Sequence, residues 1–225
     1  MNLPPPVTRN LLIAMVVVFI LQHFFEEPLL LHFALWPWGD FPVGTDADGL
    51  PVTAGFQPWQ LLTYGFLHDT RSILHLLFNG IALYQFGGRI EQALGPRRFT
   101  TYFLVCVAGA GLFQLLVTSM MVASGGDAFP TLGASGGVFG LLLAYGMMFP
   151  RDQMILFPIP KPISARTMVI IFGVAEIVFG VSGTLPGVAH FAHLGGMLFG
   201  WLMLRYWRGL PPFRRRRPPG PRLVR

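Results

Sequence analysis

The sequence predicts an all-α fold: a polytopic membrane bundle of six transmembrane helices. Three observations predict it. Apolar residues make up 53% of the 225 residues and charged residues only 12%, which is too little charge for the surface of a soluble domain of this length. Apolar runs long enough for a membrane helix recur along the chain. The basic residues collect in alternate connections between these runs, as in multi-pass membrane proteins.

Six apolar segments are predicted to be the membrane helices. The first has only Arg9 before it and no small-residue cleavage site after it, so we expect a retained span rather than a cleaved signal peptide. The fourth and fifth segments are close to the lower length limit for a span. The predicted segments are residues 11–31, 72–89, 100–123, 133–148, 168–181 and 188–207.

Residues 1–208 are expected to form one membrane domain. The long connection at about 32–71 is rich in proline and glycine and is predicted to lie at the membrane–water interface, where tryptophan is enriched. Its tryptophans are Trp36, Trp38 and Trp59. The Pro- and Arg-rich tail at 209–225 is predicted to be disordered and cytoplasmic.

The distribution of charge predicts the orientation of the bundle. If the N-terminus is cytoplasmic, every Lys and Arg except Arg71 lies on the cytoplasmic side, and most of the acidic residues lie on the other side. The positive-inside rule therefore predicts two cytoplasmic termini, in a cell (inner) membrane. The net charge of +6 follows from this topology, so the basic tail is expected to meet anionic lipid rather than nucleic acid.

Four polar side chains are predicted to share one depth in the outer part of the bilayer. In this orientation the second, fourth and sixth segments all begin at the outer face. Their first turns carry His75 with Asn79, Ser135, and His193, respectively. Polar groups at membrane depth normally face the interior of the bundle, and they indicate function.

These residue types suit acyl transfer through a serine nucleophile. The Ser135 hydroxyl needs a base to take its proton, and a histidine such as His193 is the usual base. The oxyanion that forms needs donors, which the His75 and Asn79 side chains and the backbone at Gly136 can supply. The sequence therefore predicts Ser135 and His193 as catalytic residues and an oxyanion hole of Asn79, His75 and Gly136.

Glycines are predicted to let the fourth and sixth segments approach each other closely. Gly136 and Gly140 are spaced G-x-x-x-G, and so are Gly196 and Gly200. Small residues at this spacing allow two helix backbones to come together. We therefore expect the serine and the histidine to meet.

Three motifs on these segments resemble those of the rhomboid intramembrane serine proteases, and the resemblance covers residues 59–204. The patterns are H-x-x-x-N, G-x-S-x-G-x-x-G and A-H-x-x-G-x-x-x-G. The matching residues are His75 and Asn79; Gly133, Ser135, Gly137 and Gly140; and Ala192, His193, Gly196 and Gly200. The resemblance implies a rhomboid-like fold, a Ser–His dyad without a third acid, an oxyanion hole lined by the H-x-x-x-N pair, and membrane helices as substrates. Phe139 stands where many members carry a tyrosine, and its ring is expected to stack on the dyad histidine.

Two alternatives stay open. A histidine-based metal-binding transporter or metallohydrolase could use His68, His75, His190 and His193, although no H-E-x-x-H motif occurs in the sequence. A catalytically inactive relative would bind membrane helices without cleaving them.

The protease interpretation carries expectations about partners and about two further polar residues. It calls for no cofactor and no metal, and its expected partners are transmembrane segments of protein substrates and membrane lipid. Glu176 lies in the middle of the fifth segment and could in principle orient His193. We expect Glu176 and His190 to be structural instead.

Overall fold

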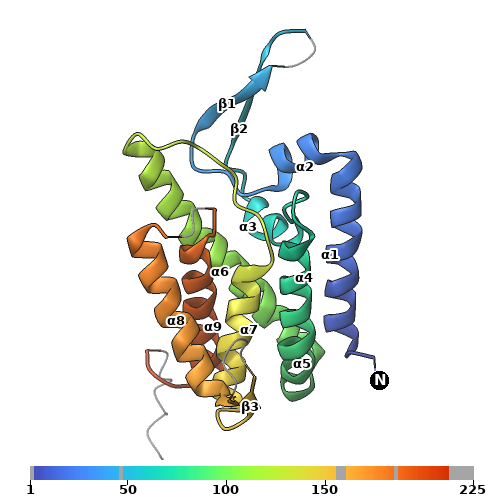
Figure 1. The fold of residues 1–225 in the computed structure, drawn as a ribbon, viewed down its shortest axis with the longest axis vertical. Coiled ribbons are helices and arrows are strands. Elements are labelled where there is room, and N and C mark those ends of the chain that lie inside the picture. Colours follow the sequence, from blue (N-terminus) through green and yellow to red (C-terminus); the bar gives the residue numbers. More distant parts are fainter. Residues whose placement is uncertain (1–2, 46–47, 156–160, 185–186, 213–225) are drawn as a thin grey trace, which may run out of the picture.

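The computed structural model describes residues 3–45, 48–155, 161–184 and 187–212, so most of the predicted tail lies outside the described residues. Within this part of the chain, six helical rods run side by side (Figure 1). The rods are α1 (Pro6–Phe24), the continuous run of α4 (Ile73–Ala82), the π-helical turn η2 (Leu83–Gly87) and α5 (Gly88–Leu94), then α6 (Pro96–Ala123), α7 (Ser135–Met148), α8 (Ala165–Ser182) and α9 (His190–Trp207).

Each rod overlaps one of the six predicted segments. Among the described residues, three helices are long and apolar enough to cross a membrane, namely α1, α6 and α8, and α7 is a shorter apolar helix. The architecture is therefore that of a helical membrane bundle, as the composition predicts.

The all-α prediction is incomplete, because two short antiparallel hairpins occur in the connections. Strand β1 (Asp40–Thr45) pairs with β2 (Pro51–Gly55), and β3 (Gln153–Met154) pairs with β4 (Ile163–Ser164). The first hairpin projects from one end of the bundle, and the N-terminus and β3 lie at the opposite end (Figure 1). Both hairpins give partners to backbone groups that no helix satisfies.

The first predicted span ends earlier than residue 31. Helix α1 stops at Phe24, and a short helix, α2 (Glu26–Phe33), follows it. Between them Phe25 has φ −134° and ψ 43°, which is outside the helical region. Pro28 explains the break, because it has no N–H to donate to the Phe24 carbonyl and its ring would clash with that carbonyl.

The carboxylate of Glu91 on α5 caps the N-terminus of α1. It accepts hydrogen bonds from the backbone N–H groups of Val7 (2.9 Å) and Thr8 (2.7 Å) and from the Thr8 hydroxyl (2.8 Å). The first N–H groups of a helix lack partners within the helix, and its N-terminus favours negative charge. Glu91 thus ties two rods together at the end that carries the N-terminus.

The long connection after α2 is organised around Gln60, which opens the short helix α3 (Gln60–Thr63) and is fully buried. Its Oε1 accepts from the backbone N–H groups of Trp36 (3.2 Å) and Gln57 (3.1 Å). Trp36 is buried, whereas Trp38 and Trp59 are 71% and 50% exposed. Of the three predicted interfacial tryptophans, Trp36 therefore belongs to the core.

Helix α7 starts deeper in the bundle than the helices beside it, because its leading segment runs inward first (Figure 1). In this segment the Thr131 N–H donates to the Leu35 carbonyl (2.8 Å), and the Leu35 N–H donates to the Thr131 carbonyl (2.9 Å). The Gly133 N–H then donates to the carbonyl of Tyr64, in the 3₁₀ turn η1 (Tyr64–Phe66), at 3.0 Å. Gly133 has φ +120°, a left-handed conformation that favours glycine. The turn ends at Ser135, the first residue of α7.

Glycines set the distances from α7 to α6 and α9. A Cβ atom added to Gly196 of α9 would lie 1.9 Å from the Gly136 carbonyl oxygen, so these two backbones touch. A Cβ at Gly140 would lie 2.4 Å from the Cys106 sulfur of α6. The other predicted packing glycines are Gly137 and Gly200. A Cβ atom added to Gly137 would collide with Phe103 of α6, and one added to Gly200 would collide with Tyr102 of α6. The predicted close approach of the fourth and sixth segments is thus present at Gly136 and Gly196, while Gly200 packs on the third.

His68, in the loop before α4, is fully buried in the protein. The Gln22 side chain of α1 pairs with its backbone in both directions: Nε2 donates to the His68 carbonyl and Oε1 accepts from its N–H, both at 2.9 Å. The His68 ring lies edge-on to that of His75, with centroids 5.1 Å apart. Burial first, and the neighbouring His75 second, lower the pKa of His68 to about 4.

Gly196→Ala should separate α7 from α9. The added methyl group overlaps a backbone oxygen that cannot rotate away, and overpacking of this kind costs about 2–3 kcal/mol. We expect a matching loss in the free energy of unfolding in detergent. Gly80→Ala on α4 is the matched control, because its Cβ would come no closer than 3.8 Å to another residue, at Leu12. Equal stability of the two variants would contradict the packing assignment.

Stability should fall as the pH drops from 6.5 towards 4. In that range the unfolded chain binds a proton at His68 that the folded chain does not, which favours the unfolded state by up to about 3 kcal/mol. Denaturation in detergent across this pH range should reveal the slope. His68→Gln cannot titrate, so its slope should be smaller than that of the wild type, and equal slopes would show that His68 does not contribute.

Candidate active site

The turn before α7 presents the Ser135 hydroxyl at the start of that helix. Ala134 is the N-cap, with φ −72° and ψ −5°, and Ser135 is half-buried as the first helical residue. The first backbone N–H groups of a helix have no partner within it, and they point along its axis together with the positive end of the dipole. Ser135 therefore lies beside donors that can stabilise a negative oxygen.

His193 of α9 lies against this serine. Its Nε2 is 2.8 Å from Ser135 Oγ, a hydrogen-bond distance, although 58 positions separate the two residues in the sequence. The imidazole is buried, with 7% of the residue exposed. The Phe139 ring is parallel to it, with an interplanar angle of 4° and centroids 4.1 Å apart. The structure thus brings together the two predicted catalytic residues, and Phe139 fixes the plane of the imidazole.

His75 and Asn79 approach the same place from α4. A Cβ atom at Gly133 would be 2.7 Å from His75 Nε2 and 3.9 Å from Ser135 Oγ, so both atoms border one small space beside the turn. The Asp69 N–H donates to His75 Nδ1 (3.3 Å), which leaves the ring proton on Nε2 in the neutral tautomer. His75 can therefore direct an N–H group towards this space.

Asn79 lies one helical turn further along α4 and is 5% exposed. One N–H of its side-chain amide donates to the His75 carbonyl at 2.9 Å, within the same helix. The amide carries a second N–H, which this bond does not use. The side chain is thus held in a fixed orientation, and its second N–H is available to donate a hydrogen bond.

Glu176 and His190 are joined to His193, although the sequence offered Glu176 as a partner of His193 only in principle and favoured a structural role for both. Glu176 Oε2 lies 2.6 Å from His190 Nδ1 and 2.9 Å from His193 Nδ1. The second contact is close but poorly aligned, and His193 Nδ1 is a buried nitrogen without a well-aligned hydrogen-bond partner in the described chain. The signal in the sequence was Glu176 itself, since an acidic residue inside a membrane segment usually has a partner.

The histidines proposed for a metal site fall into two separate groups. His68 and His75 contact each other beside α4, whereas His190 and His193 share α9. The donor atoms of His190, His193 and Glu176 do lie within 4.8 Å of one another. The Nε2 atom of His193, however, faces the serine rather than this cluster. The four-histidine set that the sequence suggested is therefore not assembled.

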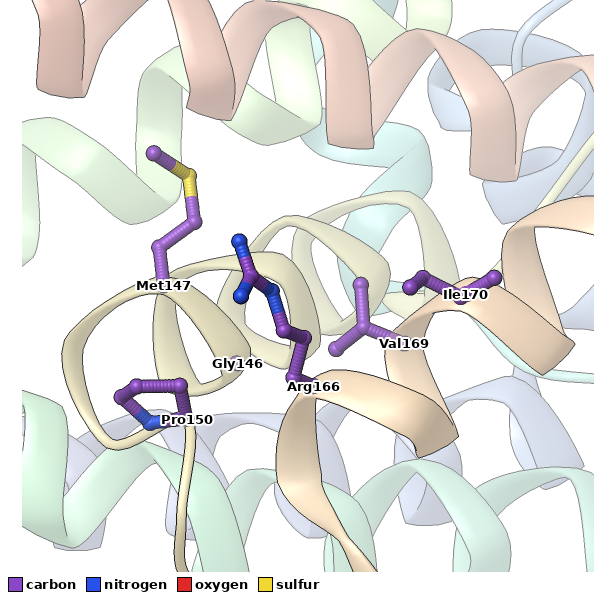
Figure 2. Close-up of a pocket in the computed structure, with 6 residues that line it drawn as sticks. All are labelled: Gly146, Met147, Pro150, Arg166, Val169 and Ile170. Carbon is purple, nitrogen blue, oxygen red and sulfur yellow. The ribbon is translucent and has the colours of Figure 1, made fainter.

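A cavity of about 350 Å³ lies between α7 and α8 (Figure 2). Its walls come from the last turns of α7 and the first turns of α8, with the Arg166 side chain among them. The lining residues are Gly146, Met147, Pro150, Arg166, Val169 and Ile170. None of the predicted site residues borders this cavity, so it is not where Ser135 and His193 would act.

The sequence of this chain is similar to those of known proteins. A model of the rhomboid domain matches residues 55–209. RHOMBOID-like protein 4 of Arabidopsis thaliana is 33% identical over 158 residues, which are 69% of this chain and 36% of that protein. Rhomboid protein 1, mitochondrial, of Saccharomyces cerevisiae is 31% identical over 131 residues, 56% of this chain and 37% of that protein. Rhomboid protease GlpG of Serratia proteamaculans is 23% identical over 214 residues, 90% of this chain and 62% of that protein.

The matched region contains every residue predicted to form the site. The chain spans between about a third and two thirds of the length of these three relatives. The apolar helices and the matched domain together make it a multi-pass integral membrane protein. The chain belongs to the rhomboid family.

Proposed function

We propose that this chain is an intramembrane serine endopeptidase, which hydrolyses peptide bonds in or near transmembrane segments of other membrane proteins. One observation carries the proposal: Ser135 Oγ and His193 Nε2, on two different helices, lie 2.8 Å apart. A serine hydroxyl beside a histidine nitrogen is the arrangement that activates a serine nucleophile. The match to a relative named a rhomboid protease supports the same activity.

The reaction would proceed through an acyl-enzyme. Ser135 Oγ attacks the carbonyl carbon of the scissile bond while its proton moves to His193 Nε2. The tetrahedral intermediate collapses when the same nitrogen returns the proton to the leaving amine. A water molecule, deprotonated by His193, then releases the acyl group from the serine.

The oxyanion of each tetrahedral intermediate would lie in the space between the Ser135 turn and α4. The donors available there are His75 Nε2–H, the free amide N–H of Asn79 and the backbone N–H groups at the start of α7, including that of Gly136. Glycine at position 133 leaves this space open, because a side chain there would collide with His75. Fixed donors of this kind stabilise charge that develops only during the reaction.

For the placement in the membrane we propose six spans with both termini in the cytoplasm. The β1–β2 hairpin and the start of α7 would then face the outer side, and the N-terminus the cytoplasm, in a cell (inner) membrane. Arg97, Arg98, Arg151, Arg166 and Arg205 support this orientation, because the ends of the bundle that carry them would face the cytoplasm. Lipid and the transmembrane segments of substrates are the proposed partners, and no cofactor or metal is needed.

Ser135→Ala and His193→Ala should each abolish cleavage of a transmembrane substrate in detergent. The two side chains act as one unit, so the double variant should be little worse than either single variant. The measurement is gel-based cleavage of a tagged membrane helix, with fluorophosphonate labelling of the wild type at Ser135. Ser124→Ala and His23→Ala are matched controls at exposed positions away from the site, and they should keep full activity.

Three outcomes would contradict this proposal. Full cleavage by Ser135→Ala would exclude the serine as nucleophile. Loss of wild-type activity with a metal chelator would favour the metallohydrolase. An absence of both cleavage and fluorophosphonate labelling in a folded wild-type protein would favour the inactive relative.

Asn79→Ala and His75→Ala should lower kcat far more than they raise KM. An oxyanion donor acts mainly in the transition state, and loss of one donor costs on the order of 3 kcal/mol, or about 10²-fold in kcat. Steady-state kinetics of the purified variants would measure this, with Leu77→Ala as a control on the exposed side of the same helix. Wild-type kcat in both variants would mean that this face of α4 is only structural.

A further inference from the structure

We propose that Glu176 is a positioning residue, which holds His193 in the tautomer that a general base requires, and that His190 in turn holds the Glu176 carboxylate. This inference rests on the proposed protease function. It extends the reacting pair by two residues: Glu176, from helix α8, which contributes nothing else to the site described above, and His190, from α9. The Ser–His dyad would then be supported by an acid, contrary to what the family resemblance implies.

The side chains of Glu176, His190 and His193 are buried, and both histidines contact the same carboxylate oxygen of Glu176. Glu176, His190 and His193 are 7%, 5% and 7% exposed. Glu176 Oε2 contacts Nδ1 of both histidines, at 2.6 and 2.9 Å. His190 and His193 are three residues apart on α9 and so share a face of that helix. One carboxylate from α8 can therefore serve both rings.

The surroundings of His190 determine where its protons lie. His190 Nε2 is 3.1 Å from the Thr184 carbonyl oxygen, which can only accept a hydrogen bond, so Nε2 carries a proton. At the other nitrogen, Nδ1 and Glu176 Oε2 share one further proton across 2.6 Å. Whichever atom carries that proton, the pair as a whole is neutral. A neutral pair avoids most of the cost of burying an isolated carboxylate in a membrane bundle.

The same oxygen determines the tautomer of His193. Oε2 keeps a lone pair for His193 Nδ1 in either protonation state of the pair, so it favours a proton on Nδ1. Nε2 is then unprotonated and can accept the Ser135 proton across 2.8 Å. In the opposite tautomer, Nε2 would carry a proton and could not act as a base.

The contact between Glu176 and His193 is suited to strengthen during the reaction. When His193 accepts the serine proton it becomes an imidazolium, and its Nδ1–H becomes a stronger, charged donor. The resting contact is 2.9 Å and poorly aligned, and such contacts often tighten only in the reacting complex. Stacked Phe139 restricts the imidazole to movement within its own plane, which keeps Nδ1 directed towards the carboxylate.

A purely structural role for Glu176 makes a different prediction from a positioning role. A structural residue affects the fraction of folded protein, and the folded molecules keep their kcat. A positioning residue lowers kcat in molecules that are fully folded and bind substrate normally. The two roles are therefore separated by kinetics on folded protein.

The test is the cleavage kinetics of the purified full-length chain in detergent. Glu176→Ala should lower kcat on the order of 10²-fold with KM within about twofold, as when a base loses the group that fixes its tautomer. Glu176→Gln should recover part of this loss, because its amide oxygen can take the place of Oε2 and accept from His193 Nδ1–H. Glu91→Gln is the matched control: it alters another buried carboxylate, far from Ser135, and should reduce stability without changing kcat.

A second measurement does not depend on catalysis. In protein labelled with ¹⁵N-histidine, the His193 resonances, assigned with His193→Gln, should report a proton on Nδ1 in the wild type and a mixture of tautomers in Glu176→Ala, with Glu176→Gln closer to the wild type. An unchanged tautomer or an unchanged kcat in folded Glu176→Ala would overturn the proposal. A wild-type chain that cleaves nothing would instead refute the protease function, and the tautomer would still decide the role of Glu176.

Discussion

The structure depends on one backbone contact, between Gly136 of α7 and Gly196 of α9. A Cβ at Gly196 would lie 1.9 Å from the Gly136 carbonyl oxygen, so only glycine permits this spacing of the helices. Without a hydrophobic effect between helices in lipid, packing of this kind is a main source of association. The contact lies one residue from Ser135 and three from His193. The packing that holds the bundle together thus also sets the distance between the two side chains.

Much of the fold and of the candidate site could be predicted from the sequence, because the relevant signals are local. Apolar length, the two G-x-x-x-G pairs and the order of three motifs predicted six rods and which of them carry Ser135, His193, His75 and Asn79. The break after Phe24 was missed, although Pro28 signals it. The hairpins in the connections were missed because strand pairing of a few residues depends on partners that sequence periodicity does not indicate.

What the sequence did not reveal concerns polar residues whose partners are distant in the sequence. Gln60 and His68 lie in the connection predicted to be interfacial, and both are fully buried in the protein. Gln60 bonds to the backbone of Trp36, and His68 is paired with Gln22, 46 positions away. Glu176 was correctly placed inside a span, but a single sequence does not reveal that two histidines of α9 face it. Such pairs are fixed by the rotation of each helix about its axis, which composition and spacing leave undetermined.

Membrane burial makes these pairings interdependent. Three buried polar side chains of this bundle have partners on other elements: Glu91 meets the start of α1, Gln22 the loop before α4, and Glu176 the face of α9. A carboxylate facing a single neutral base would be costly to bury, whereas one that shares a proton with His190 forms a neutral pair. That neutrality lets an acid lie beside His193 in a bundle of this kind. His190 can then support the arrangement through Glu176, without a hydrogen bond to Ser135 among the described residues.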